Sequence, residues 1–406
     1  MKAFLFISKK ILKINKGDYS GNIVKIAIGT IALGVTVMLM SIFIVNGFKN
    51  QIEKKIAGFV GHVRISNFDY NESWETSPIE IDDECIDNIL KIKYVDAVNA
   101  YALKAGILKT REEFEGIVFK GVGEDFDFKN FSGNIVSGQF PAYSDTIIND
   151  SVVISKIVAD KLSLSVNDKV DGYFLNNEST RVRRFVVAAI YESGFGDYDK
   201  MFVVSDINVI RQLNNWSENQ SNGYEIYLHS ISDIDIASKE ILPLLPYNCK
   251  LQSVYEINPQ VFDWLSLQDV NVVVLLSIMG IVCVITIISV LLIIIIERTS
   301  MIGILKSLGM NNKDVRKIFL VKAAYVVTIG IVIGNAIALI VSYLQIKFKI
   351  ISLAQESYYV NSVPVEINLL QMFTVDVATF IVCMLIVIIP TALITKVSPI
   401  STIRYE

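Results

Sequence analysis

Motifs for metal binding, nucleotide binding and nucleophilic catalysis are missing from this 406-residue chain. Its only two histidines, His62 and His229, stand in neither an H-E-x-x-H nor a C-x-x-C context, so we expect no metal site. No G-x-x-x-x-G-K-S/T sequence occurs, so the chain has no P-loop with which to bind ATP. No G-x-S-x-G sequence marks a nucleophile either. The chain is therefore predicted to be neither an enzyme nor a cofactor-binding protein.

Charge is almost absent from four long apolar runs, each of which reaches the roughly 18–20 residues that cross a bilayer. They are Ile23–Val45, Val270–Ile296, Val321–Leu344 and Leu369–Ile394. Asp376, in the last run, is expected at its outer interface. The spans thus lack the mid-membrane charges of a proton- or ion-coupled transporter. Any energy for work must enter the protein elsewhere.

The remaining charges are strongly segregated. Residues 49–269 carry 21 basic and 34 acidic residues, a net charge of −13, whereas the rest of the chain carries +9. Basic residues gather before the first apolar run and in the interruption between the second and third runs. By the positive-inside rule both of these segments face the cytoplasm, which places both termini inside and the acidic segment outside. Basic and aromatic residues do not cluster outside the membrane, so nucleic acid is not an expected partner.

These patterns predict an α-helical membrane protein with four transmembrane helices and a large mixed α+β extracytoplasmic domain between the first and second spans. Small residues of the first span, Gly29 and Gly34 among them, allow another helix to approach closely. The predicted order is a cytoplasmic amphipathic segment (1–20), transmembrane helix 1 (21–48), the extracytoplasmic α+β domain with its stalks (49–269), transmembrane helix 2 (270–296), a cytoplasmic helical loop (297–318), transmembrane helix 3 (319–346), a short external loop (347–368), transmembrane helix 4 (369–394) and a cytoplasmic tail (395–406).

The exported domain shows both strand and helix periodicities. Strands are expected at His62–Ser66, Ala97–Leu108, Gly116–Val122, Phe185–Tyr191, Lys200–Val204 and Glu225–Leu228, and helices at Asp82–Ile92, Ser155–Leu162, Ser205–Leu213 and Asp233–Leu245. Ser205 is the expected cap of its helix, and Gly172 marks a turn. We expect two lobes, one from the flanks and one from an insertion around residues 110–200. A disulfide between Cys85 and Cys249 is permitted in an exported segment, but the spacing does not establish one.

The interruption Glu297–Phe319 predicts a helix of about two to three turns. One face of this helix is apolar and consists of Met301, Ile304, Leu305 and Leu308. Thr299 or Ser300 can cap its start, Gly309 can end it in the left-handed conformation, and Asn311 or Asn312 can cap the next helix. The apolar face is free to dock on another protein, which we interpret as a separate cytoplasmic motor subunit.

Several stretches resemble one known family. Glu297–Arg298, Ile302–Gly309 (IGILKSLG) and Ile318–Phe319 resemble the coupling-helix signature of the FtsX/MacB-like ABC transporter permeases. Three further stretches resemble the LolC/LolE lipoprotein-releasing branch: Gly58–Ser66, Gly138–Val170 and Tyr358–Val365. The order of one span, a large exported domain and three spans is also similar to that branch. One departure is Met301, where many relatives carry an acidic residue.

The resemblance implies a division of labour between subunits. Two permease chains, a homodimer or a pair with a related paralogue, would bind two copies of an ABC ATPase subunit that carries ATP and Mg. Closure of the ATPase pair would push the coupling helix, and the span-plus-stalk helices would carry the movement to the periplasmic domains. These would take a lipoprotein from the outer leaflet of the bacterial inner membrane and pass it to a periplasmic lipoprotein carrier.

The resemblance also suggests residue roles. ATPase coupling would involve Glu297, Arg298, Met301, Gly303, Ile304, Leu305, Lys306, Leu308 and Gly309. An outer cavity for acyl chains would be lined by Met40, Ile44, Phe48, Val261, Trp264 and Leu265. Glu297 and Arg298 can instead be interfacial anchors, and the cavity set can equally be stalk packing.

Two relatives of the same mechanical class are the alternatives. A MacB-like efflux permease normally carries its own nucleotide domain, which this chain lacks. An FtsX-like regulator transmits ATPase motion to a periplasmic partner and usually has a smaller exported domain. A membrane-anchored sensor or adhesion module, a different class, has no reason to maintain a docking helix on the cytoplasmic side.

Overall fold

A computed structural model describes residues 19–68, 77–124, 126, 135–144, 147–176, 179–354 and 358–391. The predicted cytoplasmic tail and residues 1–18 of the amphipathic segment lie outside this part. The chain divides into two compact units. We call them the membrane unit (residues 1–49, 264–351 and 363–406) and the sheet unit (residues 50–263 and 352–362).

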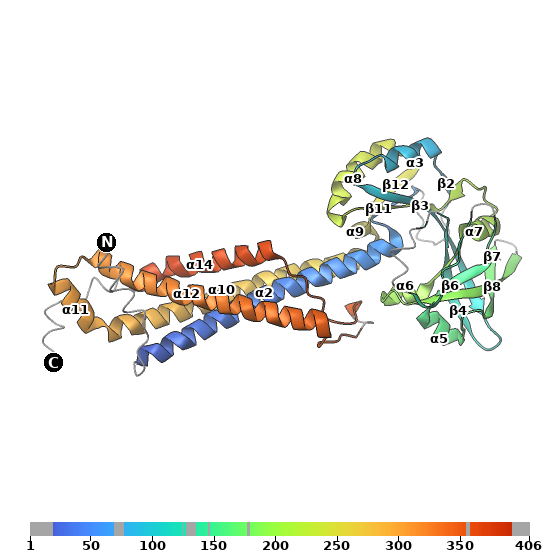
Figure 1. Ribbon diagram of the computed structural model, residues 1–406. Coiled ribbons are helices and arrows are strands. Elements are labelled where there is room, and N and C mark those ends of the chain that lie inside the picture. The colour runs from blue at the N-terminus through green and yellow to red at the C-terminus, as the bar shows by residue number, and fades with distance from the viewer. Residues whose placement is uncertain are drawn as a thin grey trace. The chain divides into compact units, whose positions relative to one another are not determined.

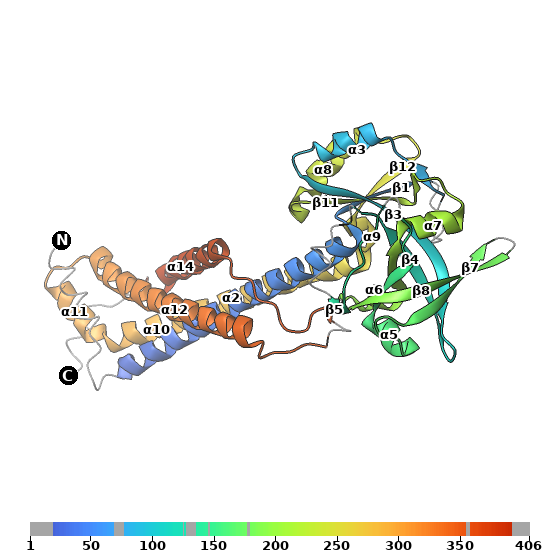
Figure 2. The ribbon, with the colours of Figure 1, turned by 45° about the vertical axis from the view of Figure 1, so that its right-hand side comes forward.

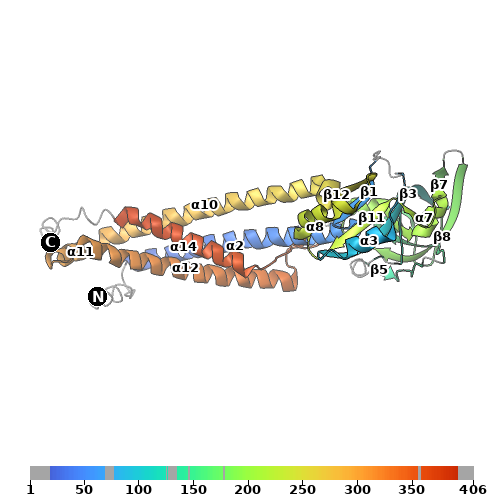
Figure 3. The ribbon, with the colours of Figure 1, turned by 90° about the horizontal axis from the view of Figure 1, so that it is seen from above.

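Four long helices form the membrane unit together with one short helix. The long helices are α2 (Tyr19–Val60), α10 (Pro259–Glu297), α12 (Asn312–Phe348) and α14 (Leu369–Thr391), and α11 (Thr299–Ser307) joins α10 to α12. The long helices run along one another (Figure 3). All four are long and apolar enough to span a membrane, which confirms the four predicted transmembrane helices. The last turns of α2 and the first turn of α10 belong to the sheet unit, so these two helices continue beyond the apolar runs.

Small residues bring α2 close to its neighbours, as expected. A Cβ at Gly34 would lie 2.8 Å from the sulfur of Cys283, and one at Gly334 would lie 2.7 Å from the carbonyl oxygen of Ala32. The Thr36 hydroxyl donates to the carbonyl of Gly334 at 3.0 Å. Helices α2 and α12 therefore touch backbone to backbone.

Asp376 has a partner on a neighbouring helix. It is half-buried on α14, and its carboxylate accepts a hydrogen bond from the side-chain amide of Asn335 on α12 at 2.7 Å. This partner was not expected from the sequence, because Asn335 lies 41 residues earlier in the chain, and the interfacial position of Asp376 stays a prediction.

A ten-stranded sheet forms most of the sheet unit (Figure 1). Its order is β12 (Cys249–Ser253), β1 (Val63–Asn67), β11 (Gly223–Leu228), β3 (Val95–Lys109), β4 (Phe114–Val122), β9 (Phe202–Asp206), β6 (Ser151–Ser155), β8 (Ser179–Tyr191) and β5 (Ile135–Gly138), with β7 (Lys169–Asn176) paired to β3 and β8. Strands β2 (Ile79–Glu80) and β10 (Gln220–Ser221) form a separate pair. The helices are α3 (Asp83–Leu90), α5 (Lys156–Leu162), α6 (Gly196–Met201), α7 (Ile207–Asn214), α8 (Ile234–Ile241) and α9 (Val254–Ile257), with 3-10 turns η1 (Ile231–Asp233) and η2 (Leu242–Leu244).

Part of this sheet closes into a ring. Strand β3 pairs with both β4 and β7, so that β3, β4, β9, β6, β8 and β7 form a barrel. Three phenylalanines fill it, with Phe119 lying 4.8 Å from Phe174 and 5.2 Å from Phe185 between ring centroids. Gly172 does not mark a turn: it lies within β7, where a Cβ would meet the Phe185 ring at 2.7 Å. The aromatic packing requires glycine at this position.

The expected lobes share a strand. The flanks supply β12, β1, β11, α3 and α8, which gather in one part of the unit (Figure 2), and residues 114–206 supply most of the barrel. Because β3 is paired on both sides of this division, the two sets of elements share a strand within one compact unit, and their division into two lobes stays a prediction.

The predicted strands and helices fall on observed elements, with corrections at their ends. Asp206, not Ser205, caps α7: its side chain accepts from the Asn208 amide. Residues 200–201 end α6, so the strand predicted from Lys200 begins at Phe202. Strands β2, β5, β6, β7, β10 and β12 were missed. The sequence of β6 (SVVIS) is buried on both faces, so it lacks the alternation that identifies a strand.

Replacing Gly334 with alanine is expected to lower the melting temperature of the detergent-solubilised chain. The new Cβ would press on the Ala32 carbonyl, and overpacking of this kind typically costs about 1–3 kcal/mol. The matched control is Gly29→Ala, where a Cβ meets nothing within 4 Å and the helix gains a better helix former. Equal melting temperatures for the two variants would contradict the backbone contact between α2 and α12.

Candidate functional site

The loop between α10 and α12 begins with a correction to the predicted cap. The Thr299 hydroxyl donates to the carbonyls of Ile295 and Ile296, at 3.1 and 2.6 Å. It therefore satisfies the end of α10 and does not cap α11. Arg298 occupies the cap position of α11, and its side chain makes no capping bond within the described part of the chain.

The end of α11 is as predicted. Gly309 has a φ of +87°, its amide donates to Lys306, and the Met310 amide donates to Leu305, each at 3.0 Å. This pair of bonds is the Schellman pattern that closes a helix on a left-handed glycine. Asn311 follows in extended conformation at the cap position of α12. The short helix is thus fixed at its end by its own backbone.

Helix α11 presents two faces. Ile302 and Gly303 are buried, and Met301 packs against the same membrane-unit core. Ile304 and Leu308 are 52% and 79% exposed. The single apolar stripe expected from the sequence is therefore divided, because α11 must also bury a face against its own unit. The α11 outer surface consists of Ser300, Ile304, Ser307 and Leu308. Among the other residues expected here, Glu297 and Gly309 are exposed, and Arg298, Leu305 and Lys306 are half-buried.

The residues expected to line an acyl-chain cavity lie in both units. Within the membrane unit, the rings of Phe48 and Trp264 meet edge to face at 6.5 Å, and Leu265 is buried. The Met40 sulfur accepts from the hydroxyl of Ser342 at 3.3 Å. Ile44 of the membrane unit and Val261 of the sheet unit are half-buried. Their role in binding substrate stays a prediction.

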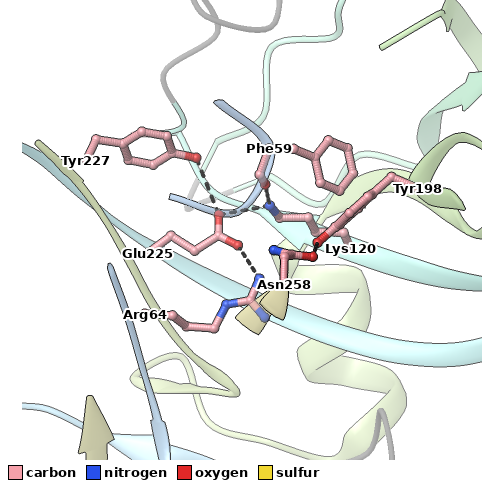
Figure 4. Close-up of polar contacts among 7 residues, drawn as sticks. All are labelled: Phe59, Arg64, Lys120, Tyr198, Glu225, Tyr227 and Asn258. Atoms are coloured by element: carbon pink, nitrogen blue, oxygen red, sulfur yellow. Dashed lines mark hydrogen bonds and ion pairs between the residues drawn. The ribbon is translucent and has the colours of Figure 1, made fainter. Parts of the chain in front are cut away.

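A buried ionic group in the sheet unit was not anticipated (Figure 4). The Glu225 carboxylate, with its side chain 1% exposed, meets Nη2 of Arg64 at 3.0 Å and Nζ of Lys120 at 2.8 Å. The Tyr227 hydroxyl donates to the same carboxylate at 3.4 Å. Arg64 lies directly opposite Glu225 in the β1–β11 register, and its guanidinium sits 4.7 Å from the Tyr101 ring centre. Burial lowers the pKa of Lys120, while the Glu225 carboxylate acts to raise it. Two cations thus share one carboxylate.

The C-terminal end of α2 and the residue before α10 contact this ionic group. Nζ of Lys120 also donates to the Phe59 carbonyl of α2 and lies 4.7 Å from the Phe59 ring centre. The Tyr198 hydroxyl donates to Oδ1 of Asn258, the residue before α10, at 2.8 Å. We call this set the buried polar cluster: Phe59, Arg64, Lys120, Tyr198, Glu225 and Asn258.

Two family models match the chain. Residues 26–244, more than half of it, match the MacB-like periplasmic core domain, and residues 273–399 match the FtsX-like permease C-terminal region. The chain belongs to the FtsX/MacB-like permeases. This confirms the resemblance seen in the sequence, and the fold is that of a membrane-spanning permease with a periplasmic core domain.

Relatives of this permease match it over nearly their whole length. The "Lipoprotein-releasing system transmembrane protein LolC" of Buchnera aphidicola is 21% identical, with 93% of this chain and 92% of that protein covered. The protein of the same name in Haemophilus influenzae is 21% identical, with 99% and 98% covered. Among solved structures, the periplasmic region of MacB from Actinobacillus actinomycetemcomitans is 14% identical, covers 51% of this chain and 95% of that one, and has a TM-score of 0.36.

Two cysteines and two histidines of the sheet unit were considered in the sequence for a disulfide or a metal site. Cys85 and Cys249 are both free thiols. His229 lies 3.6 Å from Asp96 and is mostly exposed. His62 is half-buried after α2, and its Nδ1 accepts the amide of Leu228 at 3.1 Å. Burial lowers the pKa of His62 to about 4.

His62 is expected to make the sheet unit less stable in acid. Unfolded histidine binds its proton near pH 6.5, whereas folded His62 does so only near pH 4, so its contribution is present above pH 6.5 and lost as the pH falls towards 4. The loss is on the order of 2 kcal/mol by pH 4.5. His62→Asn keeps an acceptor and cannot titrate. The melting temperature of the permease should therefore fall less between pH 7 and pH 4.5 in this variant than in wild type.

The exposed histidine supplies the matched control for this experiment. His229→Asn should behave as wild type over the same range of pH. A wild-type acid sensitivity that His62→Asn fails to reduce would contradict the prediction.

Proposed function

We propose that this permease is the membrane subunit of an ABC transporter of the mechanotransmission type. It couples ATP hydrolysis by a separate ATPase subunit to the extraction of lipoproteins from the outer leaflet of the bacterial inner membrane, for transfer to a periplasmic carrier. The observation that carries the proposal is the match, over more than nine-tenths of the chain, to relatives named as lipoprotein-releasing LolC proteins. ATP and Mg belong to the ATPase, and this chain binds no cofactor in the cycle.

The α11 outer surface is the proposed docking site for the ATPase. Two exposed apolar side chains, Ile304 and Leu308, lie one turn apart on a helix whose other face is held by the membrane unit. Large exposed apolar residues in a short polar loop favour a protein partner. The Schellman closure at Gly309 keeps the helix short and fixes its end, so that a push on it moves α10 and α12 and does not unwind the loop.

The charge distribution supports the proposed orientation. Arg298 and Lys306 lie between α10 and α12, and Lys313 lies in the first turn of α12, on the side that the positive-inside rule assigns to the cytoplasm. Both termini then lie in the cytoplasm and the acidic sheet unit lies in the periplasm. A second permease chain, identical or related, completes the pair that two ATPase subunits would engage.

Extraction from the outer leaflet suits a protein without a polar route through its spans. Within the described helices, Asp376 is the acidic residue of the apolar runs, and it is bonded to Asn335. A lipoprotein is already on the periplasmic side, so neither its protein part nor its acyl chains need to cross the bilayer. Phe48, Trp264 and Leu265 remain the candidates for contact with acyl chains.

Leu308→Asp and Ile304→Asp are each expected to weaken ATPase binding about tenfold or more, because a charge placed in an apolar contact removes more than 1 kcal/mol. The measurement is the affinity of the purified permease for the P-loop ATPase that copurifies with it. Asn312→Asp is the control, since it adds the same charge to an exposed residue at the start of α12 and removes no apolar surface. If all three variants bind alike, α11 is not the docking site.

Depletion of the permease tests its substrate. Lipoproteins destined for transfer should then accumulate in the inner membrane, as measured by fractionation of the two membranes. A cell-division or cell-wall defect with normal lipoprotein sorting would instead indicate a regulator of the FtsX type and overturn the proposal.

A further inference from the structure

Three chain segments connect the sheet unit to the rest of the permease. They are the end of α2, the start of α10 and residues 352–362, which lie between α12 and α14. Movement of the membrane helices can reach the sheet along the chain through these segments. Within the sheet unit, the two helix ends contact the buried polar cluster directly, and the third segment contacts it through the ring of Phe195.

The end of α2 is held by a lysine from the sheet. The last carbonyls of a helix have no partner within it and carry partial negative charge. Lys120 of β4 donates to one of them, at Phe59. Directly after the helix, Gly61 has a φ of +74°, and a Cβ there would lie 3.1 Å from that of Glu225. The helix is therefore fixed against β11 within two residues of its end.

The start of α10 is held by a hydrogen bond from the sheet unit to the residue that caps it. The Asn258 carbonyl accepts the amides of Val261 and Phe262, which makes Asn258 the cap of α10, with Pro259 in its favoured first position. The Asn258 side chain is in turn the acceptor for the Tyr198 hydroxyl. The Tyr198 ring lies 5.0 Å from that of Phe59. Tyr198 thus touches both helix ends.

The third segment, residues 352–362, contacts the rest of the sheet unit through a stacked aromatic pair. The Tyr359 ring stacks on Phe195 at 4.4 Å and 18°, and Phe195 lies 5.0 Å from Tyr198. The Tyr359 carbonyl accepts from Nζ of Lys55, on α2, at 2.9 Å. This segment is therefore bonded to α2 and is linked through the Phe195 ring to the same tyrosine that meets the other two.

The ionic bonds at the centre of the cluster restrict the angles at which the joined segments can meet. Arg64 and Lys120 carry two positive charges against one on Glu225, and the excess is met by the carbonyl end of α2. Charge-assisted bonds are short and angular, whereas apolar contacts allow surfaces to slide. A buried ionic set of this kind is not required for stability, since apolar side chains of similar volume often serve as well. It is suited to fixing the positions of the parts that it joins.

We propose that the buried polar cluster is the joint through which movement of α2 and α10 reaches the sheet, with Lys120, Tyr198 and Asn258 as positioning residues. This inference rests on the proposed function, because it assumes that ATP hydrolysis moves these helices. The cluster binds no substrate and takes no part in hydrolysis. It converts displacement of the helix ends into displacement of β1, β4 and β11.

The test compares two tyrosines in the full permease, purified with its copurifying ATPase in lipid nanodiscs. Tyr198→Phe removes the bond to Asn258, and Tyr143→Phe removes a buried hydroxyl bond of similar length, 3.1 Å, to the Ser151 carbonyl away from the joint. Each loss should cost about 1 kcal/mol and lower the melting temperature similarly. Hydrogen exchange of peptides from β1 and β11 is measured without nucleotide and with ATP plus orthovanadate, alongside ATP hydrolysis.

Wild type and Tyr143→Phe should show a nucleotide-dependent change in exchange, and Tyr198→Phe should lose it while still hydrolysing ATP. Asn258→Asp retains an acceptor oxygen, and the Asn258 amide nitrogen has no partner in the described structure, so this variant should keep the change. Asn258→Leu should lose it. Lys120→Met with Glu225→Gln, which removes opposite charges together, should also lose it.

The outcomes separate the inference from the proposed function. If wild type responds to nucleotide and Tyr198→Phe and Asn258→Leu respond equally, the joint lies elsewhere and the inference alone is overturned. If wild type hydrolyses ATP with no response in the sheet unit, or if no ATPase copurifies, the mechanical proposal and the inference fall together.

Discussion

Two cations, the half-buried Arg64 and the buried Lys120, share the single carboxylate of Glu225, and this imbalance of charge constrains much of the sheet unit. A lysine with a 3% exposed side chain needs partners that replace water. The carboxylate supplies one, and the unsatisfied carbonyl end of α2 supplies another. The helix therefore has to end where β4 and β11 can reach it, which the left-handed Gly61 permits. The contacts of Lys120 with Glu225 and with the end of α2 therefore both balance the buried charge and determine where α2 ends.

Much of the fold could be predicted because it follows local patterns. The four spans are long apolar runs, and strands such as β4 and β11 coincide with recognisable apolar segments. What failed depends on distant partners. β6 is buried on both faces, Gly172 is needed by Phe185 on the neighbouring strand, and β3 pairs with strands of both the flanks and the insertion. None of these can be read from a window of ten residues, because the deciding atoms belong to other segments.

The candidate sites divide in the same way. Gly309 was predictable because a helix end on a left-handed glycine is a local event. The inward turn of Met301 was not, since periodicity identifies an apolar face without saying which part of it the protein itself covers. The buried polar cluster was invisible to the sequence: Arg64 and Glu225 are 161 residues apart, and Lys120 and Glu225 are 105 apart. Scattered charges are usually solvated, so their burial emerges only from the pairing of strands.

The spans contain few charged residues, and this bears on the role proposed for the buried polar cluster. A transporter driven by ions places charges along its spans, but these helices offer one amide–carboxylate pair, Asn335 and Asp376, in their described parts. In the proposed mechanism, work done on one side of the membrane is carried by the positions of helices. Apolar packing between smooth helices resists separation better than sliding, so position is transmitted only as well as the helix ends are held. Bonds with fixed angles at Phe59 and Asn258, where α2 ends and α10 begins, would supply that resistance in this mechanism.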